Sequence, residues 1–278
     1  MLFLLLAILS SAMISILMRI SSNRISANLS MLAVNYLACA LLGLGYTGFQ
    51  PVTPEHPGFG VAFWLGVLSG FLYLAGFVLF QTNVRRNGIV LSSIFMKLGL
   101  LVPVVMSMLL FREMPTFIQM AGFCIALGAI VLINWKKDRD GKGFGMGLLL
   151  MLLMCGGSDA MSKVFERYGS ADCSDSYLFF TFAVAFLLCA GAVLCKKEKP
   201  GFPELLYGTL IGIPNFFSAK FLLGALTKLP AVVVFPSFSV ATLLVVTLTG
   251  VAVFRERLSR RQWIALGAII AALICLNI

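Results

Sequence analysis

The feature that most constrains this chain is a series of ten apolar runs separated by short polar turns. Each run has close to the 20 or so mainly apolar residues that a helix needs to cross the hydrocarbon core of a bilayer. Because lipid cannot satisfy backbone N–H and C=O groups, a crossing segment must make its hydrogen bonds within itself, as an α-helix does. The sequence therefore predicts an all-α integral membrane protein with ten transmembrane helices, at residues 2–18, 29–46, 61–82, 89–111, 116–135, 144–165, 177–195, 205–226, 230–254 and 262–278.

The composition excludes a soluble globular chain. Of the 278 residues, 60% are hydrophobic and 12% are charged, whereas soluble domains carry roughly 25% charged residues. The run that begins at Met1 has no basic stretch before it and no small-residue cleavage site after it, so we expect a retained span and not a signal peptide. The expected location is the cell inner (plasma) membrane, with a multi-pass topology.

The net charge of +10 is distributed by loop and is not gathered on one polar face. Fifteen of the 21 Lys and Arg residues fall in alternate loops, which the positive-inside rule places in the cytoplasm, with both termini outside. This distribution argues against a nucleic-acid-binding surface. The seven Cys residues are scattered without a CxxC pair, so we expect neither a disulfide framework nor a metal site, and no cofactor.

The two halves of the chain also contain matching segments, which indicates an internal repeat. Residues 111–119 match 254–262, Gly66–Gly70 matches Gly208–Gly212, and residues 10–13 match 158–161. Each half holds five spans, and an odd number means that the two halves enter the membrane in opposite orientations. We therefore predict an inverted 5+5 repeat, with repeats at 1–137 and 138–278, around a central cavity with a ligand site near the midplane. The repeated glycine pairs predict close helix packing in both halves, and chance convergence of membrane sequences is the alternative to a repeat.

Five plus five spans with this repeat resemble the drug/metabolite transporter superfamily, in particular its EamA-type branch. The resemblance extends over the whole chain, and its most specific feature is an apolar run that ends in an acid and is followed by Gln and a small-residue helix. These residues are Glu113, Gln119 and Gly122 in the first half and Glu256, Gln262 and Ala265 in the second. The resemblance implies a carrier of small organic metabolites that is driven by a proton or other gradient or works by exchange. It also implies cytoplasmic termini, which conflicts with the charge count.

Ionisable residues inside the predicted spans are few, and a charge at that depth is costly enough to indicate function. Lys97 lies near the middle of its span, and we weigh a substrate-facing role against a structural ion pair with Asp159. Asp159 is the only carboxylate inside a predicted span, and Lys163, one turn further on, is its alternative partner. Lys163 and Lys220 lie nearer to span ends, where a long side chain can reach the interface. Of these two, only Lys220 is kept as a site candidate.

Polar and helix-breaking residues gather in the same spans. Pro103, Pro214 and Pro236 each remove a backbone donor; Pro103, for example, is expected to leave the carbonyl of Gly99 without its helical partner. Broken backbone is tolerated in a membrane where it is buried or lines a wet cavity. For each Ser or Thr hydroxyl near these prolines, the alternative to substrate binding is a hydrogen bond to the backbone of its own helix or to another helix. The candidate substrate-binding residues are Lys97, Asp159, Asn215, Lys220, Tyr73, Ser11 and Ser237.

The function that these features predict is a secondary active transporter that moves an anionic or zwitterionic metabolite, such as an amino acid or organic acid, by alternating access. The reason is that the candidate residues carry more positive than negative charge. Three alternatives stay open. The first is an exporter of drugs or other cations, with Asp159 taking the role that a glutamate of span 1 has in the related small multidrug exporters. The second is a flippase for lipid-linked head groups, and the third is a non-transporting scaffold.

An enzyme is not expected, because the sole histidine, His56, lies in a loop and no catalytic motif is present. The expected partners are a small-molecule substrate and the lipid bilayer, with protons as the candidate coupling ion and no nucleic acid. We expect a monomer or a homodimer.

Overall fold

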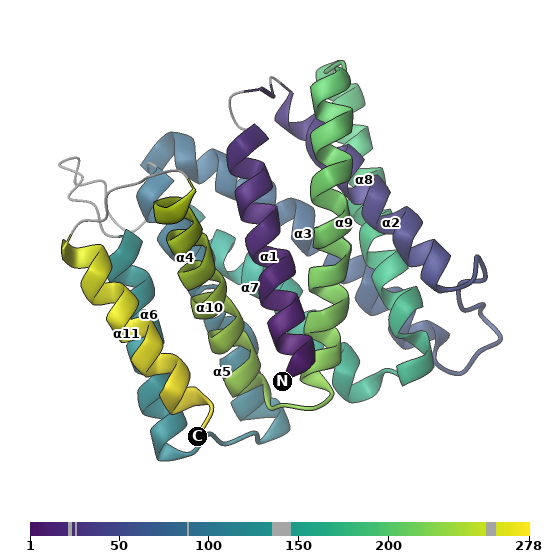
Figure 1. The fold of residues 1–278 in the computed structure, drawn as a ribbon. Helices are drawn as coiled ribbons and strands as arrows, with labels where there is room; N and C mark the ends of the chain where they lie inside the picture. The colour runs from purple at the N-terminus through teal and green to yellow at the C-terminus, as the bar shows by residue number, and fades with distance from the viewer. Residues whose placement is uncertain (22–23, 26, 88, 135–145, 254–259) are drawn as a thin grey trace. The chain divides into compact units, whose positions relative to one another are not determined.

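The computed structural model describes the chain apart from residues 22–23, 26, 88, 135–145 and 254–259. Throughout the described residues the regular structure is helical (Figure 1). The helices are α1 (Leu2–Ser21), α2 (Asn28–Tyr46), α3 (Phe59–Asn87), α4 (Ile89–Leu98), α5 (Leu101–Phe111), α6 (Phe117–Asn134), α7 (Met146–Tyr168), the 3-10 turn η1 (Ala171–Cys173), α8 (Ser174–Lys196), α9 (Phe202–Leu226), α10 (Ala231–Ala252) and α11 (Arg260–Leu276).

Seven helical stretches of the described chain are long and apolar enough to cross a membrane, and they lie in α1, α2, α3, α7, α8, α9 and α10. Three shorter apolar stretches are Phe95–Phe111, Phe117–Leu132 and Gln262–Leu276. Large apolar side chains lie exposed on these helices; Leu109 is 74% exposed and Phe117 is 91% exposed. Extensive exposed apolar surface is unfavourable in water and marks a surface that meets another apolar phase. The all-α membrane architecture is thus confirmed for the described residues.

Several described helices are longer than the predicted spans, and three of them thereby take in an acidic residue. α7 ends three residues later than predicted, and α8 and α9 each begin three residues earlier. Glu166, Asp175 and Glu204 therefore lie inside helices, so Asp159, the only carboxylate within the predicted limits, is one of several within the observed helices. Asp175 and Glu204 lie in the first turn of their helices, where the helix dipole favours an acid. Glu166 lies near the end of α7, where it forms an ion pair with Lys163.

The described chain divides into two compact units, and each combines helices from both halves of the sequence. Unit 1 comprises Met1–Leu74 and Met161–Thr227, and unit 2 comprises Ala75–Ala160 and Lys228–Ile278. The long helices α3 and α7 each contribute residues to both units.

In unit 1, α2 packs along α8 and α9, and α1 packs along α9. The α2–α9 contact depends on glycine. A Cβ atom on Gly208 would lie 2.7 Å from the carbonyl oxygen of Met31, and one on Gly212 would lie 2.7 Å from that of Asn35. The Gly66–Gly70 pair lies equally close to α8. Both predicted glycine seams are confirmed, since only residues without a side chain allow the backbones to approach this closely.

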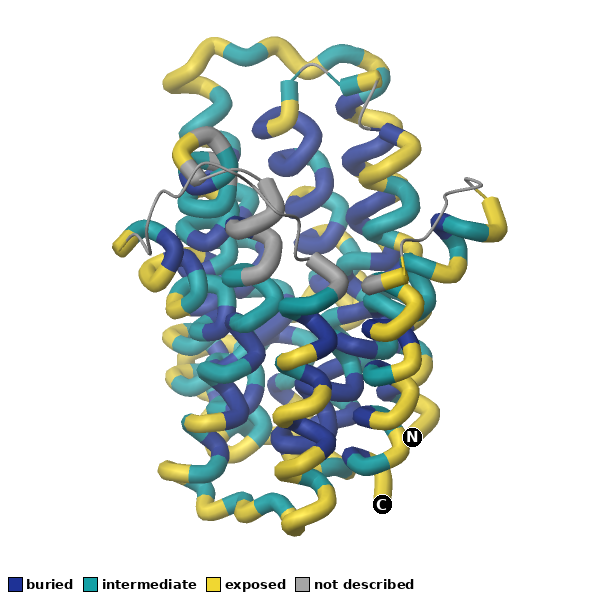
Figure 2. The backbone as a smooth tube through the Cα atoms, turned by 90° about the vertical axis from the view of Figure 1, so that its left-hand side faces the viewer, coloured by how far each residue is buried: buried dark blue, intermediate teal, exposed yellow. Residues whose placement is uncertain are grey.

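In unit 2, α6 packs along α11, and α10 contacts α5, α6 and α11. Gly122 of α6 makes the α6–α11 approach possible, because a Cβ atom there would lie 2.8 Å from the Cβ atom of Cys275. Figure 2 shows buried and exposed positions alternating along the helices, so that a helix has one side packed on its neighbours and another side exposed. This pattern places the apolar cores of the units between the helices.

Candidate functional site

The predicted span at 89–111 is not one helix. It is divided into α4, which ends at Leu98, and α5, which begins at Leu101. The backbone turns through i+3 hydrogen bonds, from Gly99 N–H to the Met96 carbonyl at 3.2 Å and from Val102 N–H to the Gly99 carbonyl at 2.9 Å. Pro103 thus supplies no i+4 donor to the Gly99 carbonyl, as expected, but the carbonyl is still bonded because the tighter turn provides Val102 N–H in its place. We call residues 97–102 the helix break.

Helix α7 crosses the helix break at van der Waals distance. A Cβ atom on Gly156 would meet the carbonyl oxygen of Gly99 and would lie 2.7 Å from Cγ2 of Val102. Conversely, a Cβ atom on Gly99 would lie 3.1 Å from the backbone nitrogen of Gly156. Two glycines that face each other thus bring the main chains of α7 and the helix break together in unit 2.

This crossing brings two of the predicted site residues together. Lys97 lies two residues before Gly99, in the last turn of α4, and Asp159 lies three residues after Gly156 in α7. Both side chains are half-buried, and their opposite charges interact electrostatically. This interaction agrees with the alternative in which Asp159 compensates the charge of Lys97, while a direct ion pair between them and contact of either residue with a substrate stay predictions.

The remaining candidate of unit 2, Ser237, lies buried in α10, where its hydroxyl accepts a hydrogen bond from Asn277 Nδ2 at 3.4 Å. Further along α10 lies Thr242, 2% exposed. Within the described parts of the chain, its hydroxyl is the buried side-chain group for which no hydrogen-bond partner is found.

In unit 1, Lys220 of α9 forms an ion pair that the sequence did not predict. Its Nζ lies 2.6 Å from Oδ1 of Asp175 and 3.5 Å from the centre of the Tyr46 ring. The ring of Tyr46 stacks on Phe216 at 5.5 Å and meets the edge of Phe217 at 6.0 Å. We call these five residues the Lys220 cluster. Asp175 was missed because the span was predicted to begin at residue 177, although an acid just before an apolar run is a helix-start signal.

Asn215 of α9 also has a partner that the sequence analysis missed. Its Nδ2 donates to Oδ1 of Asn35 in α2 at 3.2 Å, and Asn35 is 3% exposed. Beside this pair, the thiol of Cys39 donates to the carbonyl of Gly212 at 3.2 Å. The signal for Asn35 was present, since an amide inside an apolar run needs a hydrogen-bond partner once it is buried.

Tyr73 and Ser11 occupy other parts of unit 1. The ring of Tyr73 lies 6.0 Å from that of Phe182 and 6.4 Å from that of Tyr36, within an aromatic group. Ser11 is half-buried in α1, and its carbonyl accepts a hydrogen bond from the hydroxyl of Ser15 at 3.2 Å. For Ser15, the backbone-bonding alternative therefore holds in this structure.

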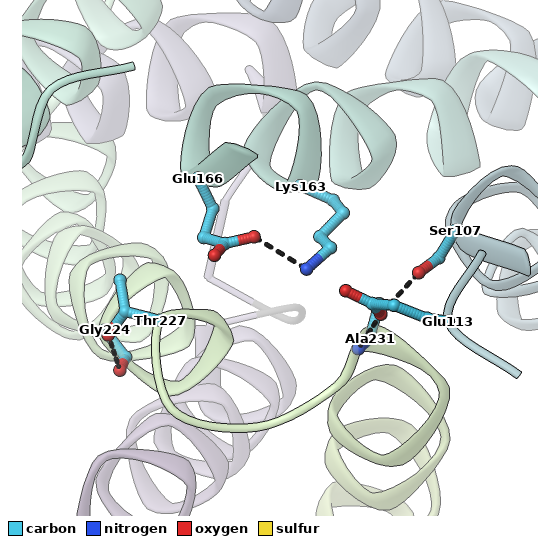
Figure 3. Close-up of polar contacts among 7 residues, drawn as sticks. All are labelled: Ser107, Glu113, Lys163, Glu166, Gly224, Thr227 and Ala231. Carbon is cyan, nitrogen blue, oxygen red and sulfur yellow. Dashed lines mark hydrogen bonds and ion pairs between the residues drawn. The ribbon is translucent and has the colours of Figure 1, made fainter. Parts of the chain in front are cut away.

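Lys163 differs from its prediction. It donates to Oε2 of Glu166 at 2.6 Å, and its side chain is 3% exposed (Figure 3). A side chain buried to this extent does not reach an interface, so the expectation of a lysine extended towards the membrane surface is wrong. The reason is that α7 continues to Tyr168, which leaves Lys163 well inside the helix.

The acidic turn that carries the family resemblance is a hydrogen-bonded cap. Oε2 of Glu113 accepts from the hydroxyl of Ser107 at 2.5 Å and from the N–H of Ala231, the first residue of α10, at 2.9 Å (Figure 3). Thr116 and Gln119 exchange side-chain and backbone hydrogen bonds at the start of α6, which is a capping box. Glu256, the counterpart in the second half, lies outside the described residues.

Comparison with known proteins identifies the family of this chain. The model of the EamA-like transporter family matches residues 1–135 and 143–278. The chain therefore belongs to the EamA-like transporter family, and it is a multi-pass membrane transporter. The resemblance drawn from the acidic turn and the repeat is confirmed, and membership of a family of transporters agrees with the expectation of a chain that is not an enzyme.

Two relatives extend over almost the full length. An uncharacterised protein of Haemophilus influenzae is 23% identical over 286 residues, which cover 97% of this chain and 95% of the relative. A solved crystal structure is similar with a TM-score of 0.75 and 16% identity, covering 99% of this chain and 94% of the other. At this identity the structural likeness supports the fold alone. Across the described residues, no group of three or more His, Cys, Asp or Glu side chains is placed to hold a metal ion.

Proposed function

We propose that this transporter is a secondary active carrier that moves a small anionic or zwitterionic metabolite, such as an amino acid or organic acid, across the cytoplasmic membrane by alternating access. In this proposal the ten predicted spans form an inverted repeat of residues 1–137 and 138–278 around a central cavity. The family match supports the transporter class. The observation that carries the proposal is the electrostatic interaction of the half-buried Lys97 with Asp159 beside the helix break.

A charged pair at a broken helix is costly to maintain in a membrane. An ionisable side chain at bilayer depth costs several kcal/mol, and a break in a helix is tolerated only where the backbone is buried or lines a wet cavity. Both features coincide where the helix break at residues 97–102 meets the part of α7 that carries Asp159. A solute with a carboxylate can compete for Lys97, and a solute with an amine can compete for Asp159. Transport requires only that such binding differ between two conformations.

Asp159 is the candidate proton carrier in this proposal. When Asp159 is protonated, Lys97 loses its partner and becomes available to an anionic solute. An Asp159→Asn variant keeps the shape of the side chain but cannot exchange a proton. We expect this variant to lose uptake driven by a pH gradient in proteoliposomes and to retain exchange of solute for solute. Gradient-driven uptake at the wild-type rate would remove Asp159 from this role.

The first experiment is a thermal-shift screen of the purified protein against amino acids, organic acids, nucleotides and quaternary amines. A compound that binds the folded state raises the unfolding temperature by mass action. We expect stabilisation by an anionic or zwitterionic compound in the wild type and in Lys199→Ala, a control with an exposed lysine in the α8–α9 turn. The shift should disappear in Lys97→Ala.

The other outcomes separate the alternatives. Stabilisation by cations alone, with no effect of Lys97→Ala, would contradict the proposal and favour a cation exporter that uses Asp159. Wild-type transport of every solute by Lys97→Ala would show that the helix break does not bind substrate. A carrier of lipid-linked head groups would bind none of the water-soluble compounds.

A further inference from the structure

The Lys220 cluster combines a cation, a replaceable anion and an aromatic wall. We propose that it binds the carboxylate of an aromatic monocarboxylate, and that the ligand carboxylate replaces Asp175 on Lys220. The inference rests on the proposed carrier function and names the chemical class of one of its solutes. Its site lies in unit 1, whereas the helix break lies in unit 2.

The ion pair defines which group the ligand must offer. Lys220 Nζ donates to a carboxylate oxygen of Asp175 at 2.6 Å, and a ligand carboxylate presents the same acceptor for the same charge-assisted hydrogen bond. Lys220 and Asp175 have no net charge together, so an anion added to the intact pair would leave an uncompensated negative charge. Binding by exchange moves this uncompensated charge onto Asp175, at the start of α8.

Asp175 is well placed to be exchanged. It lies in the first turn of α8, where the helix dipole stabilises a negative charge without the help of Lys220. Its side chain is 32% exposed, so the displaced carboxylate can be hydrated. By contrast, Lys220 keeps a second stabilising contact after Asp175 leaves, because its Nζ lies 3.5 Å from the centre of the Tyr46 ring.

The rings beside Lys220 favour an aromatic ligand. Tyr46 is 48% exposed and stacks on the buried Phe216. Phe217 and Phe221 follow on α9 with their ring centres 5.7 Å apart, and both are half-buried. Aromatic pairs gain about 0.5–1.5 kcal/mol beyond the burial of their surface. A ligand ring next to its carboxylate therefore has the exposed ring of Tyr46 as a partner beside the ammonium group of Lys220.

Replacing Asp175 by a ligand carboxylate would also change how α8 is held against α9 within unit 1. Helices α8 and α9 each pack along α2, and the Asp175–Lys220 ion pair joins α8 directly to α9. Replacing Asp175 by a ligand carboxylate removes this link. Ligand binding at Lys220 is thereby coupled to the freedom of α8 relative to α9, which is the kind of difference between bound and unbound states that a carrier requires.

The test uses 3-phenylpropanoate and its uncharged amide, 3-phenylpropanamide, as matched probes for the purified full-length protein in detergent. Asp175→Asn removes the competing carboxylate, so we expect it to bind the acid about five- to tenfold more tightly than the wild type. Asp172→Asn makes the same change of net charge at an exposed neighbouring acid and should leave the affinity unchanged. Lys220→Gln should abolish binding of the acid, and Lys220→Arg should keep it. The affinity for the amide should not respond to any of these changes.

Two results would overturn the inference. One is an affinity for the acid that is equal in Asp175→Asn and Asp172→Asn, or weaker in Asp175→Asn. The other is the absence of acid binding in the wild type, Asp175→Asn and Lys220→Arg. Uptake into proteoliposomes distinguishes these results from failure of the proposed function. Transport of other solutes without acid binding at Lys220 refutes only this site, whereas acid binding that follows the expected pattern without transport of any solute refutes the carrier.

Discussion

The carboxylate of Glu113 accepts a hydrogen bond from the backbone N–H of Ala231 at 2.9 Å and so joins the turn after α5 to the start of α10. These residues lie 118 positions apart in the sequence. The first N–H groups of a helix have no partner within the helix, and a negative charge at this end is favoured by the helix dipole. Ser107 holds the same carboxylate oxygen in place from α5 at 2.5 Å. One acidic residue therefore fixes how α5 and α10 meet in unit 2.

We expect Glu113→Ala to lower the free energy of unfolding by about 0.5–2 kcal/mol, the usual cost of losing a helix cap. Glu113→Gln keeps an acceptor oxygen and should lose less. The measurement is denaturant unfolding in detergent, with Glu55→Ala, an exposed acid in the loop before α3, as the control. Equal stability of Glu113→Ala and Glu55→Ala would show that the cap contributes nothing.

The glycine crossing between α7 and the helix break gives a second prediction. Gly156→Ala places a methyl group against the Gly99 carbonyl and Val102, and overpacking of this kind costs about 1–3 kcal/mol. Gly267→Ala in α11 is the matched control, because a Cβ atom there meets nothing within 4 Å. We expect the control to be neutral or stabilising by up to about 1 kcal/mol, since alanine favours helix more than glycine does. Similar unfolding temperatures for the two variants would contradict the close crossing.

The Asn35–Asn215 pair predicts non-additive effects on stability. Asn215→Leu removes the donor of the 3.2 Å hydrogen bond and leaves Oδ1 of the buried Asn35 with only the long 4.0 Å contact from the Cys39 thiol, at a cost of about 1–3 kcal/mol. Replacing both residues by Leu removes both polar groups and should cost less than the sum of the single changes. A double-mutant cycle of unfolding free energies measures the coupling. A coupling energy of zero would mean that the hydrogen bond is not formed.

The Lys97–Asp159 pair predicts a separation of stability from transport. Removing one charge leaves the other without compensation, so Lys97→Met and Asp159→Leu should each lower the unfolding temperature. The double variant removes both charges and should be more stable than either single variant, yet we expect it to be inactive in proteoliposome uptake. Wild-type uptake by the double variant would show that the pair serves only to stabilise unit 2.

The membrane architecture could be predicted because it depends on interactions within each segment of the chain. The length of an apolar run and the need for internal hydrogen bonds predict a helix without knowledge of its neighbours, and the glycine pairs at 66–70 and 208–212 indicated where helices approach. The limits of spans were less predictable, because Asp175 and Glu166 are polar residues inside helices and not beyond their ends. The division of residues 89–111 was signalled by Gly99 and Pro103, but the i+3 hydrogen bonds that close the turn depend on backbone geometry.

The sequence by itself determined that this chain is an all-helical membrane transporter of the EamA-like family, since apolar length, repeat and acidic turn are properties of neighbouring residues. The partners of its charged and polar side chains were decided only by tertiary structure. Asp175 reaches Lys220, Asn35 reaches Asn215, and Glu113 reaches Ala231, across separations of 45, 180 and 118 residues. In a membrane the cost of leaving such groups unpaired makes pairing necessary, but which groups meet follows from how the helices pack.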